Sequence, residues 1–136
     1  MKKSVYLIIL FFVSCNDNNF IYAENQHIIS CIDKGIYNLS ISSENNDYSY
    51  EINWVDSLSQ PPTIVNLDKI DKGFKITKYI KWKFKIINNK DFKLFNSEKI
   101  KIKRHQGDAI SQEIEVITNA NGKITKSSRN NCEYKK

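Results

Sequence analysis

Apolar and polar residues alternate along much of this chain with a period of two, which is the pattern of β-strands with one buried face. The longest run spans residues 74–87. Its apolar positions are Phe74, Ile76, Ile80, Trp82, Phe84 and Ile86, and its other positions are Lys75, Thr77, Tyr79, Lys81, Lys83 and Lys85. The spacing predicts one strand with the first set in the core and the second in solvent. Lys78 alone interrupts the apolar set, which predicts a bulge or bend there.

Similar alternation predicts further strands at 37–42, 48–54, 92–95, 99–103, 114–118 and 123–127. A turn cluster at 43–47 makes a hairpin of the first two, and Asn121-Gly122 favours a tight turn between the last two. Residues 56–63 contain two prolines and are expected to form a loop, whereas 64–72 fit either a short helix or a strand. We therefore expect a mainly β fold, an antiparallel β-sandwich or small barrel of six to eight strands, with at most one or two short helices.

The first 23 residues resemble a secretory signal. Two lysines precede an unbroken apolar run from Val5 to Val13, which is about half of the roughly 20 residues that a membrane-crossing helix needs. No membrane span is therefore expected. Cleavage after Ala23 would leave residues 24–136 as a single domain. Alternatively, Cys15 ends a lipobox-like sequence in which Phe12 replaces the usual Leu, and it would then be lipidated.

Three cysteines occur in the chain, and either processing route leaves Cys31 and Cys132 near the two ends of the mature protein. Outside the cytosol such a pair is expected to form a disulfide. The bridge would close a loop of about 100 residues and hold both ends of the domain. The predicted location is the periplasm, with an outer-membrane lipoprotein or a secreted protein as alternatives.

Charge divides the chain into an acidic and a basic half. Residues 24–68 hold one lysine and seven acids, a net charge of −6, whereas 69–136 hold 18 lysines and arginines and seven acids, a net charge of +11. Such asymmetry can steer a partner toward one face. Lysines on exposed strand faces also keep a sheet soluble.

No catalytic, metal-binding or cofactor signature is present, and we expect no enzyme activity. The two histidines, His27 and His105, lie in no recognisable arrangement with a nucleophile and an acid. Nucleic acid is not an expected partner either. Single-strand binders place aromatic rings and cations on one surface, whereas the predicted strand at 74–87 puts Trp82 and Phe84 opposite Lys81, Lys83 and Lys85.

Two features favour the recognition of a protein. The polar loop Arg104-His105-Gln106-Gly107-Asp108 could enter a cleft, and the lysines of the basic half could steer an acidic partner toward it. The candidate contact residues are therefore Lys81, Lys83, Lys85, Arg104, His105 and Asp108.

The signal-like start, the length of the mature chain and the Cys31/Cys132 pair together resemble periplasmic bacteriocin immunity proteins, and among them the pesticin-type proteins. The resemblance implies a stoichiometric inhibitor of a cell-wall-degrading toxin, a muramidase with an acidic cleft, and carries over no catalytic residue. The alternative is a secreted glycan- or lipid-binding module, such as an adhesin or toxin-binding subunit. A glycan reader would be expected to expose Trp54 or Tyr79 for stacking.

Overall fold

The computed structural model describes residues 20–32, 34–105 and 112–132. These residues form ten strands and one short 3-10 helix, so the predicted mainly β class is confirmed, with more strands than the six to eight expected. The elements are β1 (Ile21–Glu24), β2 (His27–Ser30), β3 (Asn38–Ser43), β4 (Tyr48–Trp54), β5 (Ile64–Asn66), β6 (Phe74–Ile80), β7 (Lys83–Ile87), η1 (Asn89–Asp91), β8 (Lys99–Arg104), β9 (Gln112–Thr118) and β10 (Ile124–Ser127).

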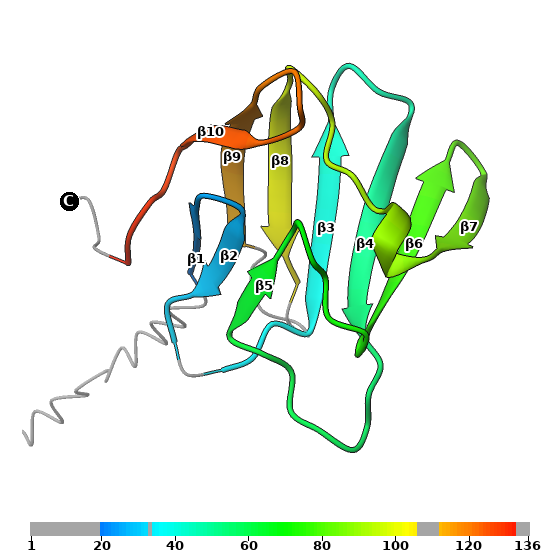
Figure 1. Ribbon diagram of the computed structural model, residues 1–136, viewed down its shortest axis with the longest axis vertical. Coiled ribbons are helices and arrows are strands. Elements are labelled where there is room, and N and C mark those ends of the chain that lie inside the picture. Colours follow the sequence, from blue (N-terminus) through cyan, green and yellow to red (C-terminus); the bar gives the residue numbers. More distant parts are fainter. Residues whose placement is uncertain (1–19, 33, 106–111, 133–136) are drawn as a thin grey trace, which may run out of the picture.

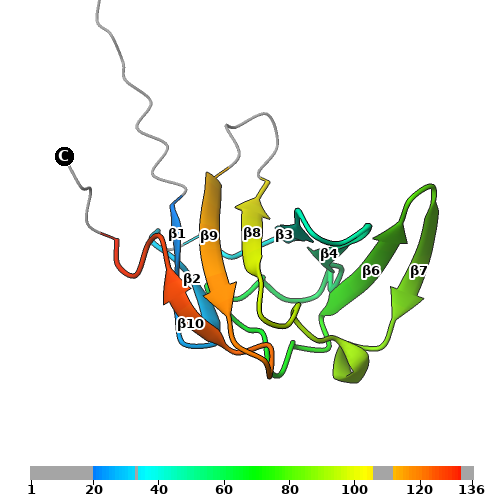
Figure 2. The ribbon, with the colours of Figure 1, turned by 90° about the horizontal axis from the view of Figure 1, so that it is seen from above.

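Two antiparallel sheets build the domain. The larger has the strand order β10-β9-β8-β3-β4-β6-β7, and the smaller has the order β1-β2-β5. The small sheet lies across the β10–β8 side of the large one, and the β6–β7 hairpin projects from the opposite side (Figures 1 and 2). The arrangement is that of a β-sandwich whose second layer covers only part of the first.

Alternation along the strands places one apolar face of each sheet in the core between them. Leu39 pairs with Ile52 and Ile52 pairs with Ile76, so the three side chains form one fully buried row across the large sheet. The small sheet contributes Ile28 and Val65, which pair across β2 and β5 and are also buried. Burial of these side chains is the main favourable term for folding.

A second part of the core lies over β4, where the connection from η1 to β8 crosses the sheet. Phe95 stacks on Tyr48 at 4.9 Å between ring centroids, and Phe92 meets Tyr50 edge-on at 5.0 Å. The predicted strand at 92–95 is therefore wrong. This segment is irregular and buries its apolar side chains by lying across the sheet, not by pairing with it.

The disulfide joins Cys31, just after β2, to Cys132, beyond β10, with the two Cα atoms 5.4 Å apart. The ambiguous segment at 64–72 begins with the short strand β5 and continues as turns. The turn between β9 and β10 is confirmed, and Gly122 has a φ of 71° there. The hairpin of β3 and β4 and the loop at 56–63 also lie where the sequence placed them.

Candidate functional site

The run at 74–87 is a hairpin and not one strand, which corrects the sequence-based prediction. Ile80 pairs with Lys83, so Lys81 and Trp82 form a two-residue turn between β6 and β7. Lys81 has a φ of 55°, in the left-handed region that such turns usually give to Gly, Asn or Asp. The two turn residues interrupt the alternation of the strand. Each residue of β7 therefore lies on the face of the sheet opposite to the one predicted.

The reversal moves three predicted core side chains to the surface. Phe84 pairs with Tyr79 and Ile86 with Thr77 on the outer face of the large sheet. Trp82 at the tip is fully exposed, and Phe84 is 70% exposed. The rings of Tyr79 and Phe84 lie 6.2 Å apart, so the outer face of the hairpin carries a contiguous apolar patch. We call Tyr79, Trp82, Phe84 and Ile86 the hairpin patch.

The inner face of the same hairpin carries lysines because no second layer reaches it. A row of paired residues runs from Ile41 through Tyr50 and Lys78 to Lys85, and it changes from apolar to charged after Tyr50, which Phe92 and Phe95 cover. The Lys78 ammonium lies over the Tyr48 ring, 3.8 Å from its centroid. Lys78 therefore interrupts the apolar pattern because it forms a cation–π contact at the border of the core. Strand pairing is continuous through Lys78, so the predicted bulge is absent there.

Some other lysines of the basic half form ion pairs. On β8, Lys99 pairs with Glu115 at 2.9 Å and Lys103 with Glu113 at 3.2 Å, while Lys101 pairs with Glu44 at 3.2 Å. By contrast, Lys81, Lys83 and Lys85 form no ion pair with any residue that the structure describes. Residues 74–87 contain five lysines and no acid. The hairpin therefore carries a group of uncompensated positive charges, in addition to those of Lys69, Lys72, Lys90, Lys93 and Lys126 elsewhere in the described basic half.

Arg104 was expected in an exposed loop, and the structure corrects this. It is the last residue of β8, is 2% exposed, and donates from its guanidinium to Ser30 Oγ at 2.8 Å, to the Gly35 carbonyl at 3.0 Å and to the Lys34 carbonyl at 3.4 Å. Burial lowers the pKa of this guanidinium. Arg104 therefore ties β8 to the end of the small sheet and is not part of a contact surface.

His105 and Asp108 were the other two contact residues expected in the loop that begins at Arg104. His105 is exposed directly after β8. Asp108 lies outside the described residues. Of the six predicted contact residues, the structure thus brings together the three lysines at 81, 83 and 85. Sequence reasoning missed the aromatic members of the hairpin patch because it assigned them to the core.

Trp54 does not form the stacking platform expected of a glycan reader. Its indole covers Gly73, where a Cβ atom would lie 2.3 Å from the ring, and meets Phe74 edge-on at 4.9 Å. Its Nε1 donates to the Ser59 carbonyl at 3.2 Å. Tyr79 is partly exposed, and its hydroxyl donates to Glu51 at 3.3 Å. The neighbouring Glu51 carboxylate raises the pKa of the Tyr79 phenol.

The hairpin exposes both aromatic rings and lysines, which bears on the question of nucleic acid. The strand register places Phe84 beside Tyr79 on the outer face, and Lys83 and Lys85 on the inner face. Single-strand binders place rings and cations on one surface, so the strands of the hairpin do not offer that combination.

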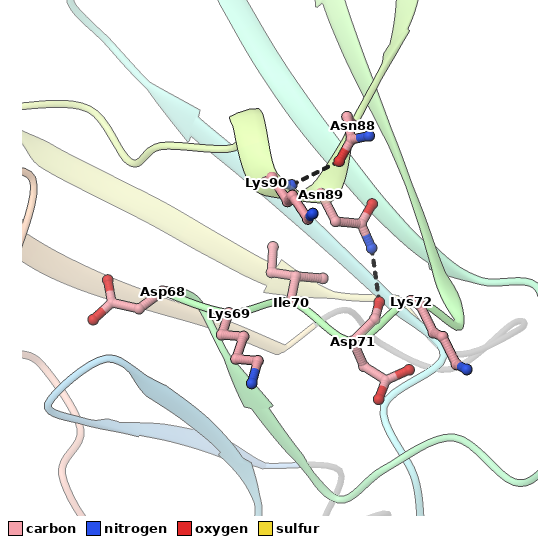
Figure 3. Close-up of a pocket in the computed structure, with 8 residues that line it drawn as sticks. All are labelled: Asp68, Lys69, Ile70, Asp71, Lys72, Asn88, Asn89 and Lys90. Carbon is pink, nitrogen blue, oxygen red and sulfur yellow. Dashed lines mark hydrogen bonds between the residues drawn. The ribbon is translucent and has the colours of Figure 1, made fainter.

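A cavity of about 790 Å³ lies between the β5–β6 connection and η1 (Figure 3). Asn89 joins its two sides by donating from Nδ2 to the Asp71 carbonyl at 2.7 Å and to the Phe74 carbonyl at 3.0 Å. The Asp71 carboxylate accepts from the Gly73 amide at 2.7 Å, and Asp68 pairs with Lys123 at 2.5 Å. The carboxylates lining this cavity are thus engaged in holding loops in place.

Within 20–32, 34–105 and 112–132, no three His, Cys, Asp or Glu side chains gather as a metal site would require. The same residues include no helix with the length and apolar character needed to cross a membrane. Comparison of the chain with protein-family models, curated proteins and solved structures finds no match.

Proposed function

We propose that this protein is an exported inhibitor that binds a cell-wall-degrading toxin of the muramidase type one-to-one, and that the β6–β7 hairpin is the element that contacts it. The observation that supports this most directly is Trp82, which is fully exposed at the tip of a hairpin flanked by unpaired lysines. A large aromatic side chain with no partner in its own domain is typical of a binding hot spot.

The shape of the hairpin favours a concave partner. It projects beyond the part of the sheet that the second layer covers (Figure 2). A protruding tip of this kind fits into a cleft. Muramidases cleave glycosidic bonds with a pair of carboxyl groups flanking the scissile bond, so their clefts carry negative charge.

The charge of the hairpin complements such a cleft. Lys81, Lys83 and Lys85 lie beside the aromatic tip, and would attract an acidic partner before the apolar contacts form. Electrostatic complementarity of this kind mainly raises the association rate and weakens as the salt concentration rises. The apolar hairpin patch would then supply most of the affinity.

Replacement of Trp82 with alanine tests the proposal. We expect the variant to bind a purified bacteriocin-type muramidase about 30-fold more weakly, the effect of losing about 2 kcal/mol at a hot spot. Affinity is measured by calorimetry, and inhibition by the clearing of a peptidoglycan suspension. Because the Trp82 side chain is fully exposed and contacts little of its own domain, the Trp82→Ala variant should unfold at the same temperature as the natural protein.

Leu58→Ala is the matched control, since Leu58 is 97% exposed in a different loop and should change neither binding nor stability. Equal affinities of the Trp82 and Leu58 variants would remove the hairpin from the mechanism. If a single-stranded oligonucleotide or a peptidoglycan fragment binds the natural protein instead, with the same dependence on Trp82, the partner class is wrong while the site is right.

A second prediction concerns charge. Changing Lys81, Lys83 and Lys85 together to glutamine should slow association with the muramidase about tenfold at low salt and much less at high salt. The matched control changes Lys99, Lys101 and Lys103 to glutamine, because these lysines are already ion-paired. Stopped-flow tryptophan fluorescence measures the association rates of both triple variants. Equal slowing by the two triple variants would show that net charge, and not the hairpin, steers the partner.

A further inference from the structure

Three of the four residues of β1, Ile21 to Ala23, lie within the 23 residues expected to be removed on export, yet the strand is built into the fold. Ile21 and Ala23 are 1% and 3% exposed, and they pair with Ser30 and Ile28 of β2. The strand also packs against β9 and β10 of the large sheet. β1 therefore belongs to the small sheet and to the core between the sheets (Figure 1).

Backbone contacts fix β1 and the residue before it on both sides. The Cys31 amide donates to the Phe20 carbonyl at 2.8 Å, directly beside the disulfide. On the other side, the Ala23 amide donates to the Arg129 carbonyl at 3.1 Å, and the Arg129 guanidinium lies 4.1 Å from the centroid of the Phe20 ring. Residues 20–23 thus join the start of the domain to its end.

Cleavage after Ala23 would dismantle this arrangement. Three of the four register pairs between β1 and β2 would be lost, leaving only that of Glu24 with His27. Ile28, which is fully buried, would lose Ala23 and keep only Val65 as a strand partner, and the amide of Cys31 would lose its acceptor. A cut at this point would remove a core strand from the mature protein, whereas a cut before Phe20 would leave the fold complete.

We infer that the export leader, itself expected from the sequence, is removed upstream of β1, at the peptide bond between Ser14 and Cys15, and that Cys15 carries a diacylglyceryl group. Of the two processing points in the sequence, this one keeps residues 20–23 in the mature chain. The protein would then be anchored to a membrane surface by lipid, with the domain beginning a few residues after the anchor.

The modification is a group transfer from a phosphatidyl lipid. The Cys15 thiol attacks the glyceryl carbon that bears the phosphate, so that a carbon–sulfur bond forms, the carbon–oxygen bond to phosphate breaks, and the thiol proton passes to the departing phosphate. Water then hydrolyses the Ser14–Cys15 peptide bond, which frees the Cys15 amine and the Ser14 carboxylate. Neither step oxidises or reduces any atom.

The test is the mass of the amino-terminal peptide of the full chain, produced in a diderm bacterium supplied with labelled fatty acid. We expect a peptide that starts at Cys15, carries the label and continues through Ile21–Glu24. In the Cys15→Ser variant, the label should be lost and the uncut precursor should accumulate. The variant Ser14→Ala is the matched control, because a small residue before the cut should leave processing unchanged.

A folded mature protein that starts at Glu24 would overturn the inference, and so would an unlabelled start at any other residue. The inference is also overturned if Cys15→Ser and the natural chain are cut at the same bond. None of these outcomes tests the role of the hairpin, because that role is measured separately, by the affinity of the Trp82→Ala variant for the muramidase.

Discussion

Replacing Arg104 with methionine is expected to lower the free energy of unfolding by about 3 kcal/mol, because it removes charge-assisted hydrogen bonds from a buried site. The lost donors serve Ser30 Oγ and the carbonyls of Gly35 and Lys34, which belong to the small sheet and the connection that follows it. Methionine replaces the aliphatic stem of arginine but has no guanidinium to donate to these oxygens. Urea denaturation followed by tryptophan fluorescence measures the loss.

Lys103→Met is the control for Arg104→Met, since the neighbouring side chain points to the outer face and forms an exposed pair with Glu113. Its cost should be about 0.5 kcal/mol or less. Arg104→Lys should fall between the two, because lysine keeps the charge but lacks the planar fork that reaches several acceptors. If Arg104→Met and Lys103→Met unfold at the same urea concentration, the guanidinium does not join the two layers.

Loss of the disulfide should have an effect of similar size. Changing both Cys31 and Cys132 to serine is expected to cost about 3 to 4 kcal/mol, since the bridge closes a loop of residues 101 positions apart and restricts the unfolded chain. For a domain of this size, that corresponds to a fall in Tm of about 10 to 15 °C. Differential scanning calorimetry at neutral pH measures the shift.

The natural protein treated with a reductant provides the control, and should unfold at the same temperature as the double serine variant. Cys31 is half-buried and Cys132 is exposed, so serine leaves no buried hydroxyl without a partner and the effect reports the cross-link itself. A Tm that does not respond to reductant would mean that the two sulfurs are not joined or that the unfolded chain is already compact.

Strand periodicity predicted most of the large sheet correctly because its inner face is covered along β3, β4, β8 and β9. Leu39, Ile52 and Ile102 are all at apolar positions of an alternating run, and all are fully buried. Local turn chemistry was equally informative at Gly122, whose positive φ agrees with the Asn-Gly pair. Where a second layer is present, sequence pattern and burial agree.

The hairpin at 80–83 could not be predicted in the same way. Lys81 and Trp82 carry no turn signal, and a lysine with positive φ is unusual enough that an unbroken strand was the better sequence-based interpretation. That interpretation placed Trp82 and Phe84 in the core. Alternation shows which residues share a face within one strand, but it does not show whether a second layer covers that face.

The position of Arg104 was wrong, and β1 was not predicted, for a related reason. The polar sequence after Lys103 looked like a surface loop, although Arg104 is held by oxygens 69 to 74 residues away in the sequence. Residues 21–23 were interpreted as the end of a leader, and only their pairing with β2 places them in a sheet. Both assignments depend on contacts between distant segments, which a local pattern cannot reveal.

The position of the sulfur bridge also decides how the domain would respond to mechanical force. A pull applied between Phe20 and Cys132 travels through the β1–β2 hairpin to Cys31 and then crosses directly to Cys132, so the rest of the polypeptide bears no tension. Stretching the molecule by its ends would therefore peel away one short hairpin and then stop at a covalent link. The large sheet, with the β6–β7 hairpin at its far edge, would keep its shape under the applied force.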